Sequence, residues 1–378
     1  MLTSVELTNF KNVKHQKIDL ERLTVFVGAN SSGKTSILDG VHLAVRAVTP
    51  QLSKREPNVR RPRPEKIFGW ERHCDWIYTR GGTGDLSIKC TTPAGTFGVE
   101  ATPPTGFPPS NTEWFGQGRW EFRLTPDDPN AFDSAFGLAR RMVFLHLNSI
   151  KLAKATYSDR TPPRVEFDGE GLAPVLAFMA LNDPDGFEAL VTEMRLLVPH
   201  LRRIRFTKTV VHRLEKEYLR FGDESVERRT RRDFQGDAIL FDFVNANNVA
   251  AHTVSEGTLM LLGLLTVLLG PSPPDILLLD DIEHGLHPLV QKSLIETLWK
   301  IMERFPNLQV LASAHSPYLL DALKPEQVRL MTIGPDGYSV CGRLVDHPQF
   351  NTWKDEMAPG ELWSLFGEKW ITEGGHEQ

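Results

Sequence analysis

The feature that most constrains this chain is a glycine-rich loop placed between a short apolar strand and a helix. Residues 23–27, Leu-Thr-Val-Phe-Val, form a continuous apolar run, which is typical of a strand buried on both faces. The loop follows at once, and apolar residues then recur at helical spacing over residues 37–48. A strand, a glycine loop and a helix in this order are the context of a phosphate-binding loop. The chain should therefore contain an α/β nucleotide-binding core.

The loop matches the phosphate-binding pattern in full, as Gly28-x-x-x-x-Gly33-Lys34-Thr35. The two glycines let the backbone turn its N–H groups onto phosphate oxygens. Lys34 is expected to reach the β- and γ-phosphates, and the Thr35 hydroxyl is expected to bind Mg²⁺. The residues predicted to contact the nucleotide here are Gly28, Asn30, Ser31, Ser32, Gly33, Lys34, Thr35 and Ser36.

A second apolar run, residues 276–279, ends in acidic residues: Asp280, Asp281 and Glu283. A carboxylate at the tip of a buried strand can hold Mg²⁺, usually through water. Taken alone, the run could equally be an ordinary strand that ends in solvated acids. Paired with the glycine loop, it predicts a magnesium site formed by Thr35 and Asp280.

Composition excludes several other classes of protein. The 378 residues are 40% hydrophobic and 24% charged, which is usual for folded globular proteins and excludes wholesale disorder. No apolar stretch reaches 18 residues, so we expect no membrane span. The first residues lack the apolar core of a signal peptide, and the three cysteines form no disulfide framework. We therefore expect a cytoplasmic protein with no membrane partner.

The apolar pattern divides the chain into two nucleotide-fold halves around an insertion. Residues 1–48 and 238–344 are predicted to form one mixed α/β domain with flanking helices. Residues 49–237 are predicted to be an inserted α+β sub-domain, β-rich to about residue 125 and helical after about residue 130. Residues 345–378 form an aromatic and acidic tail. The sequence contains no sustained heptad pattern, so we expect no long coiled-coil arm.

Four motifs in order carry a family resemblance. Residues 1–48 contain L-x-N-F-K and then G-x-N-x-x-G-K-T, and Ser255-Glu-Gly-Thr258 opens an apolar helix. Asp280-Asp-Ile-Glu-His-Gly-Leu-His-Pro288 is similar to a D-E-P-E-x-x-L-H-P segment, and Ala314-His315-Ser-Pro317 to a T-H-S-P segment. The chain thus resembles the ABC-type P-loop ATPases related to the SMC-like proteins and to the OLD (overcoming lysogenization defect) group.

The resemblance implies ATP and Mg²⁺ as cofactors and assigns further roles. Ser255 and Gly257 would hold the γ-phosphate of a nucleotide bound to the opposite subunit, which makes ATP the link of a homodimer. Asp281 stands where the family has its catalytic glutamate, and it is one methylene shorter. Glu283 could share that task, and His315 could contact the γ-phosphate. Slow ATP hydrolysis is therefore expected.

The resemblance also implies a biological setting. OLD-type ATPases often carry or accompany a TOPRIM nuclease, and no residues remain for such a domain after about residue 345. We therefore expect the ATPase subunit of a bacterial anti-phage system, of the retron or nuclease-paired type, with a separately encoded effector such as a nuclease. The alternatives are a DNA-repair ATPase that acts directly on DNA, and an ATP-dependent scaffold that does not hydrolyse ATP. A metal hydrolase is disfavoured, because the spacing of its candidate ligands fits no standard zinc pattern: His284, His287 and His315 with Asp280 and Glu283.

Two further segments leave alternatives open. Residues 202–232, from Arg202 to Arg232, hold eleven basic and five acidic residues. They could contact the phosphates of DNA or RNA, or they could form a solvated helical face with ion pairs. The tail carries Trp353, Trp363 and Trp370, which either pack on the body of the protein or dock a partner.

Overall fold

The computed structural model describes residues 1–47, 78–79, 82–103, 121–125, 129–221 and 224–373. The chain divides into two compact units. The first unit comprises Met1–Phe144, Pro274–Glu283 and Gln291–Gln378, and the second comprises Leu145–Pro273 and His284–Val290.

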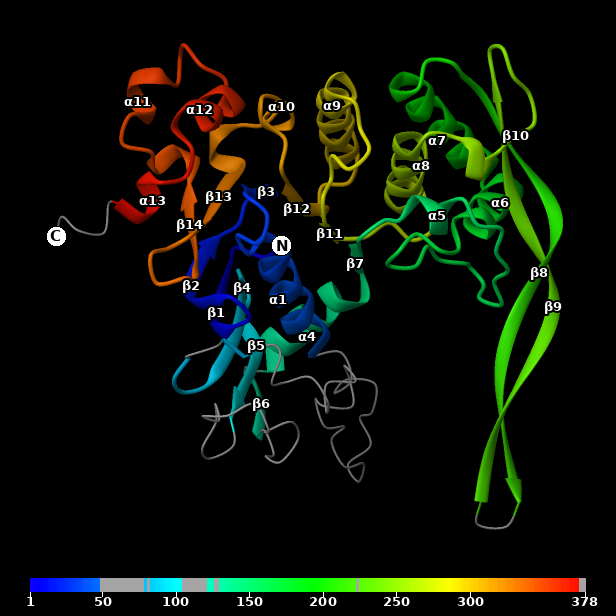
Figure 1. Cartoon of the computed structure of the whole chain (residues 1–378), viewed down its shortest axis with the longest axis horizontal. Coiled ribbons are helices and arrows are strands. Elements are labelled where there is room, and N and C mark those ends of the chain that lie inside the picture. The colour runs from blue at the N-terminus through cyan, green and yellow to red at the C-terminus, as the bar shows by residue number, and fades with distance from the viewer. Residues whose placement is uncertain (48–77, 80–81, 104–120, 126–128, 222–223, 374–378) are drawn as a thin grey trace. The chain divides into compact units, whose positions relative to one another are not determined.

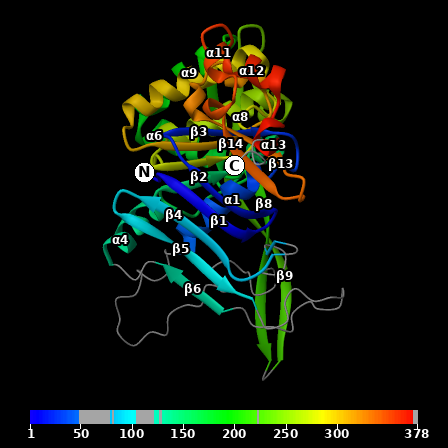
Figure 2. The ribbon, with the colours of Figure 1, turned by 90° about the vertical axis from the view of Figure 1, so that its left-hand side faces the viewer.

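The first unit contains two β-sheets (Figure 1). One sheet has the order β2-β1-β4-β5-β6, and each neighbouring pair in it is antiparallel. Its strands are β1 (Ser4–Phe10), β2 (Val13–Asp19), β4 (Leu86–Thr92), β5 (Gly95–Thr102) and β6 (Glu121–Thr125). Figure 2 shows β1, β4 and β5 side by side in this sheet.

The second sheet of this unit has the order β14-β13-β3-β12-β11-β7. Its central strands β13, β3, β12 and β11 are parallel, and β14 pairs antiparallel with β13. Its strands are β3 (Leu23–Gly28), β7 (Met142–Leu145), β11 (Ile276–Leu279), β12 (Gln309–Ala314), β13 (Val328–Ile333) and β14 (Ser339–Arg343). All residues of β3, β11 and β12 are buried, and β3 and β11 coincide with the two apolar runs that predict buried strands.

Helix α1 (Lys34–Ala47) lies between the two sheets and holds the first unit together. Its apolar residues, including Ile37 and Val41, share one buried cluster with Leu7 of the antiparallel sheet and Leu278 of the parallel sheet. The other helices of this unit are α4 (Pro129–Arg140), α9 (Pro288–Arg304, which starts in the second unit), α10 (Pro317–Leu320), α11 (Phe350–Trp353), α12 (Pro359–Phe366) and α13 (Trp370–Glu373).

The parallel order of the central strands determines where the functional loops meet. In the register, Val25 of β3 pairs with Ala312 of β12, and Ala312 pairs with Leu279 of β11. Because these strands run in the same direction, the segments that follow β3, β11 and β12 leave the same edge of the sheet. The glycine loop, the acidic segment and His315 are therefore brought together, as expected for an open α/β sheet.

The second unit combines helices with a long hairpin. Its helices are α5 (Ser149–Leu152), α6 (Leu172–Asn182), α7 (Pro184–Leu197) and α8 (Glu256–Leu269), and its sheet has the order β10-β9-β8. Helix α8 is apolar around its whole circumference and is buried in this unit. Helices α6 and α7 are separated at Asp183, which caps α7 by accepting a hydrogen bond from Gly186 N at 3.0 Å.

The basic segment is not helical, which corrects the expectation of helices throughout after residue 130. Strands β8 (Leu201–Phe221) and β9 (Glu224–Phe243) form an antiparallel ribbon (Figure 1), with β10 (Val249–Ala250) beside its base. Aromatic and β-branched residues alternate with charges, as in Ile204, Arg205 and Phe206, and this period of two favours a strand. The many charged residues made the alternation hard to recognise in the sequence. In the structure, some of these charges form ion pairs between β8 and β9, such as Arg205 with Asp242 and Lys208 with Asp237.

The predicted insertion is divided between the two units. Strands β4, β5 and β6 join β1 in the antiparallel sheet of the first unit, whereas residues 145–237 lie in the second unit together with α8. Residues 48–77 lie outside the described residues. No helix in the described part of the chain is both long and apolar enough to cross a membrane.

The tail packs on the first unit, which is the first of the two alternatives. Gly360 of α12 lies so close to α10 that an added Cβ would be 2.0 Å from the carbonyl oxygen of Pro317. Gly360 N also donates to Asp321 Oδ1 at 2.9 Å, and Leu362 is buried. Trp363 donates through Nε1 to Glu368 Oε1 at 2.8 Å within the tail, and Trp370 lies against β14, where a Cβ added to Gly342 would be 3.2 Å from its ring. These contacts order the tail as part of the first unit.

Candidate active site

The glycine loop that connects β3 to α1 has a backbone that only glycine can adopt without strain at two positions. Gly28 has φ +154°, and an added Cβ would lie 2.0 Å from Met331 O of the neighbouring strand. Gly33 has φ +103°, and an added Cβ would lie 2.3 Å from Ser339 Oγ. The Ser32 hydroxyl is buried and has no hydrogen-bond partner within the described residues. A buried hydroxyl without a partner in such a loop fits a site that accepts phosphate oxygens.

Lys34 is the first residue of α1 and is almost fully buried. Its Nζ donates to the carbonyl oxygens of Gly28 and Ala29, each at 2.9 Å, and lies 3.5 Å from His315 Nδ1. Burial lowers the pKa of Lys34, and the carboxylates of Asp281 and its acidic neighbours oppose that shift. The ammonium group is therefore held at the loop by carbonyl oxygens that phosphate oxygens could replace.

Thr35 and Asp280 form an oxygen-rich pair that suits Mg²⁺. Thr35 Oγ1 donates to Asp280 Oδ1 at 3.0 Å and lies 3.1 Å from Oδ2. Asp280 is buried and also accepts a hydrogen bond from Ser313 Oγ of β12 at 2.5 Å. A hydroxyl and a carboxylate are hard oxygen ligands of the kind that Mg²⁺ prefers. The predicted metal-binding residues thus lie together, and Ser313, which sequence reasoning missed, fixes the orientation of the carboxylate.

Asp281 is turned toward the loop by an unusual backbone conformation. Its φ is +53°, in the left-handed region that few non-glycine residues adopt. Its backbone N donates to Ser313 Oγ at 2.8 Å, and its Oδ1 lies 3.5 Å from His315 Nε2. Burial, together with the nearby Lys34 ammonium, lowers the pKa of His315. The imidazole is therefore neutral at pH 7 and can serve as a hydrogen-bond partner beside the carboxylate.

Glu283 occupies a different position from Asp281. Its Oε1 accepts a hydrogen bond from the backbone N of His315, and its Oε2 is buried with no partner within the described residues. Burial raises the pKa of Glu283, although the His315 N–H counters part of that shift. Glu283 therefore contacts the segment that carries His315, whereas Asp281 lines the pocket.

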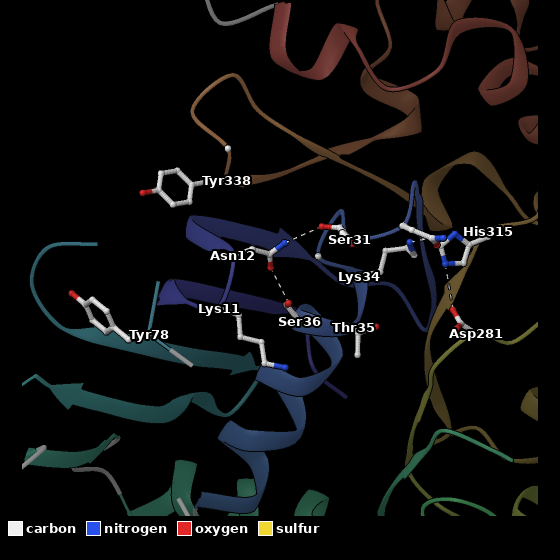
Figure 3. A pocket seen from close by; sticks show the side chains of 13 residues that line it. Lys11, Asn12, Ser31, Lys34, Thr35, Ser36, Tyr78, Asp281, His315 and Tyr338 are labelled. Carbon is white, nitrogen blue, oxygen red and sulfur yellow. Dashed lines mark hydrogen bonds and ion pairs between the residues drawn. The ribbon is translucent and has the colours of Figure 1, made fainter. Parts of the chain in front are cut away.

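The site opens into a cavity of about 840 Å³. Figure 3 shows the side chains that line it, with Lys34, His315 and Asp281 on one side and Tyr78 and Tyr338 on the other. Sequence reasoning missed the lining residues outside the motif, because they come from distant turns: Lys11, Asn12, Tyr78, Gly337 and Tyr338. Of these residues, only Lys11 and Asn12 could have been found from the sequence, because Lys11 ends the L-x-N-F-K motif and Asn12 follows it.

The remaining predicted residues lie in the second unit. Ser255 caps α8, and its Oγ accepts a hydrogen bond from Thr258 N at 3.4 Å. Gly257 follows, where an added Cβ would be 2.6 Å from Gly285 O. Figure 1 labels α8 in this unit, and His284 and His287 also belong to it. The two residues therefore stand at a helix N-terminus, and their role toward a nucleotide stays a prediction.

Comparisons with known proteins support this architecture. A family described as "AAA domain, putative AbiEii toxin, Type IV TA system" matches residues 23–321, and one described as "AAA ATPase domain" matches residues 1–43. A curated relative, "Retron Vc95 probable ATPase" of Vibrio cholerae serotype O1 biovar El Tor, is 29% identical over 99 residues. That match covers 23% of this chain and 19% of the relative, so the chain spans about a fifth of the relative's length.

Solved structures share the fold. An SMC head bound to the C-winged helix domain of ScpA has a TM-score of 0.52 at 14% identity, covering 91% of this chain and 98% of that one. An SMC head with an extended coiled coil, bound to a ScpA domain derived from Pyrococcus furiosus, has a TM-score of 0.52 at 11% identity, covering 94% and 99%. The fold is thus that of an SMC head, with a P-loop ATPase core. Since the first family model matches most of the sequence, the chain belongs to the family of AAA ATPase domains described as "AAA domain, putative AbiEii toxin, Type IV TA system".

Proposed function

We propose that the protein binds Mg-ATP, dimerises on it, hydrolyses it slowly and thereby controls a separately encoded effector in anti-phage defence. The observation that carries the nucleotide chemistry is the meeting of Lys34, Asp280 and Asp281 at one edge of the parallel sheet. A phosphate loop, a carboxylate beside its threonine and a second carboxylate facing the pocket are the parts that phosphoryl transfer to water requires.

Each of these side chains has a separate role in the proposed reaction. Lys34 and the loop N–H groups bind the β- and γ-phosphates, and Thr35 and Asp280 would hold Mg²⁺, which neutralises phosphate charge when bound. Asp281 would accept the proton of the attacking water, and neutral His315, whose Nε2 is 3.5 Å from Asp281 Oδ1, would orient that carboxylate. Asp281 is one methylene shorter than glutamate, and an error of about 1 Å in placement can cost about a hundredfold in rate. Slow turnover follows from this geometry.

Dimerisation is proposed from the residues at the start of α8. Ser255 and Gly257 are at the N-terminus of a helix of 14 residues, where N–H groups and a hydroxyl can bind an anion. They lie in the second unit, whereas the loop is in the first. In the proposed dimer, a γ-phosphate held by the loop of one subunit is shared with the α8 N-terminus of the other. ADP lacks that group and would not support the contact.

The effector is proposed from the relatives. One is a probable ATPase of a retron, and the family description names a toxin of a toxin–antitoxin system. An ATPase that holds its nucleotide for long periods suits a sensor that restrains or releases another protein. The β8–β9 ribbon supports a second candidate, an ATPase that acts directly on nucleic acid, because a two-stranded ribbon fits the major groove of B-DNA.

The proposed dimer can be tested by light scattering of the purified chain with ATP plus Mg²⁺, with ADP, and with no nucleotide. We expect the mass to double only with ATP, when hydrolysis is slowed by Asp281→Asn. Ser255→Arg should then leave ATP binding intact and prevent doubling, whereas Leu181→Arg, at an exposed position on α6 of the same unit, should not prevent it. A mass that does not respond to ATP would contradict the proposed dimer.

A further inference from the structure

The pocket is larger than a phosphate group requires. Its volume of about 840 Å³ lies in the range of roughly 300–1,000 Å³ occupied by small-molecule sites. Lys34, Thr35 and Ser36 of α1 line the part at the phosphate loop. Figure 3 shows Tyr78 and Tyr338 across the loop from His315, on the side away from the phosphate chemistry. That side is where the rest of a nucleotide would extend.

The turn that carries Tyr338 is fastened to the phosphate loop. Ser339 N, next to Tyr338, donates to Asn12 O at 2.8 Å. The side chain of Asn12 in turn donates to Ser31 O at 3.3 Å and accepts from Ser36 Oγ at 2.9 Å. Through Asn12, the β13–β14 turn is therefore held in a fixed position relative to the loop that would bind phosphates.

The turn itself is internally hydrogen-bonded. Gly334 N donates to Tyr338 O at 2.8 Å, Gly337 N donates to Gly334 O at 2.9 Å, and Tyr338 N donates to Asp336 Oδ1 at 3.2 Å. The Tyr338 ring is half-buried, and Lys14 Nζ lies 5.3 Å from its centroid. An aromatic ring held in this way loses little conformational freedom when a flat ligand binds it.

The other tyrosine of the pocket is committed to the fold. Tyr78 is only 5% exposed, and its hydroxyl donates to Gly84 O at 2.6 Å. It also forms an isolated bridge with Phe10 of β1. Tyr78 is therefore part of the wall, and Tyr338 is the better-placed aromatic surface of the pocket for a ligand.

We propose that the Tyr338 ring is the platform on which the base of the bound nucleoside triphosphate stacks. This inference rests on the proposed nucleotide binding and adds a base subsite to it. Stacking of a base on an aromatic side chain uses the π-face that every base has, so this contact adds affinity with little base selectivity. The ring contributes binding energy, whereas the phosphate loop contributes the chemistry.

Calorimetry with two probes separates the subsite from the phosphate loop. Mg-ATP carries a base, and Mg-tripolyphosphate carries phosphates alone. Tyr338→Ala should weaken ATP binding by about 5- to 150-fold, the usual range for losing one stacked base, and should leave tripolyphosphate binding within about twofold. Tyr338→Phe keeps the ring and should bind ATP as the wild type does. Tyr338→Trp should show tryptophan emission that ATP quenches and tripolyphosphate does not, relative to wild type.

The outcomes are distinct. Equal ATP affinity for Tyr338→Ala and wild type would overturn the stacking proposal, while the phosphate-loop assignment would stand. An equal loss of both probes would also overturn it, because the ring would then only support the turn. If the wild type binds neither probe, the proposed nucleotide binding itself fails, and the base subsite fails with it.

Discussion

Changing Glu283 to glutamine separates two roles that this residue could have. In the structure, Glu283 Oε1 accepts a hydrogen bond from the backbone N of His315, and only Asp281 of the two candidate bases lines the pocket. A glutamine keeps a carbonyl oxygen that can accept this hydrogen bond, but it cannot take a proton from water. Glu283→Gln should therefore preserve ATP hydrolysis if Glu283 positions His315, and should abolish hydrolysis if Glu283 is the base.

The magnitudes follow from the contacts. Removing a general base typically lowers the rate by about a hundred- to ten-thousandfold, so Asp281→Asn should have an effect of that order. Glu283→Gln should stay within about threefold of wild type, because the amide oxygen still accepts the hydrogen bond from His315 N and so preserves the geometry of His315. Glu283→Ala leaves the His315 N–H without its acceptor, which destabilises the protein by about 1–3 kcal/mol and should lower turnover.

The assay is phosphate release under saturating Mg-ATP, with ATP affinity measured in parallel so that binding and turnover are separated. We expect wild type and Glu283→Gln to be similar, Asp281→Asn to be nearly inactive with ATP still bound, and Asp281→Glu to be faster. If Glu283→Gln is as inactive as Asp281→Asn and Asp281→Glu gives no gain, Glu283 is the base and the assignment is wrong.

Three other predictions concern stability, the metal and the ribbon. Burial raises the pKa of Glu283, so ionisation of Glu283 destabilises the folded state above that raised pKa and has no such effect below the usual value of about 4.3. Glu283→Gln should therefore raise Tm at pH 7 and raise it less near pH 4.5. An equal gain in Tm at both pH values would contradict this. Ser313→Ala removes the hydroxyl that orients Asp280, so the Mg²⁺ concentration needed for half-maximal ATP binding should rise by about 10- to 100-fold in magnesium titrations. An unchanged Mg²⁺ concentration would show that Asp280 does not need this hydroxyl. Arg213 and Arg232 are directly opposite in the ribbon, so their joint change to Glu should abolish any salt-sensitive DNA or RNA binding in a filter assay; a wild type that binds neither at low salt would leave the ribbon a protein-contact surface.

The nucleotide core was largely predictable because its signals are local. The run at residues 23–27 became β3 (Leu23–Gly28), and the run at residues 276–279 became β11 with the same bounds. Strand periodicity and the glycine spacing each act within a few neighbouring residues, so the sequence displays them directly. The parallel pairing of these strands through β12 then accounts for the meeting of the loops.

The rest of the site depends on contacts between distant turns. Tyr338 lines the pocket from a turn in which Ser339 N donates to Asn12 O, and these two residues are far apart in the sequence. The division of roles between Asp281 and Glu283 depends on a left-handed backbone at Asp281, which no residue pattern marks. Ser313 sits on a buried strand, where a serine usually has no chemical role.

The ribbon shows a different limit. One interpretation of its charged residues was a solvated helical face. In the structure they lie on two strands, where Lys208 pairs with Asp237 at 2.8 Å and Arg205 pairs with Asp242 at 2.7 Å. Cross-strand pairs join residues far apart in sequence, so their compensation is invisible to a count of charges along the chain. The excess of basic residues therefore overstated how many cations the ribbon presents to a partner.

The proposed binding and hydrolysis of ATP at the phosphate loop can be tested with Lys34→Ala. Within the described residues, Lys34 Nζ hydrogen-bonds to the loop carbonyl oxygens of Gly28 and Ala29 and lies near His315, so its removal should leave the fold intact. We predict slow phosphate release by the purified wild type and none by Lys34→Ala, with similar melting temperatures for the two proteins. Equal phosphate release by both proteins would mean that hydrolysis does not use this site, because it would occur without the lysine on which the site is built.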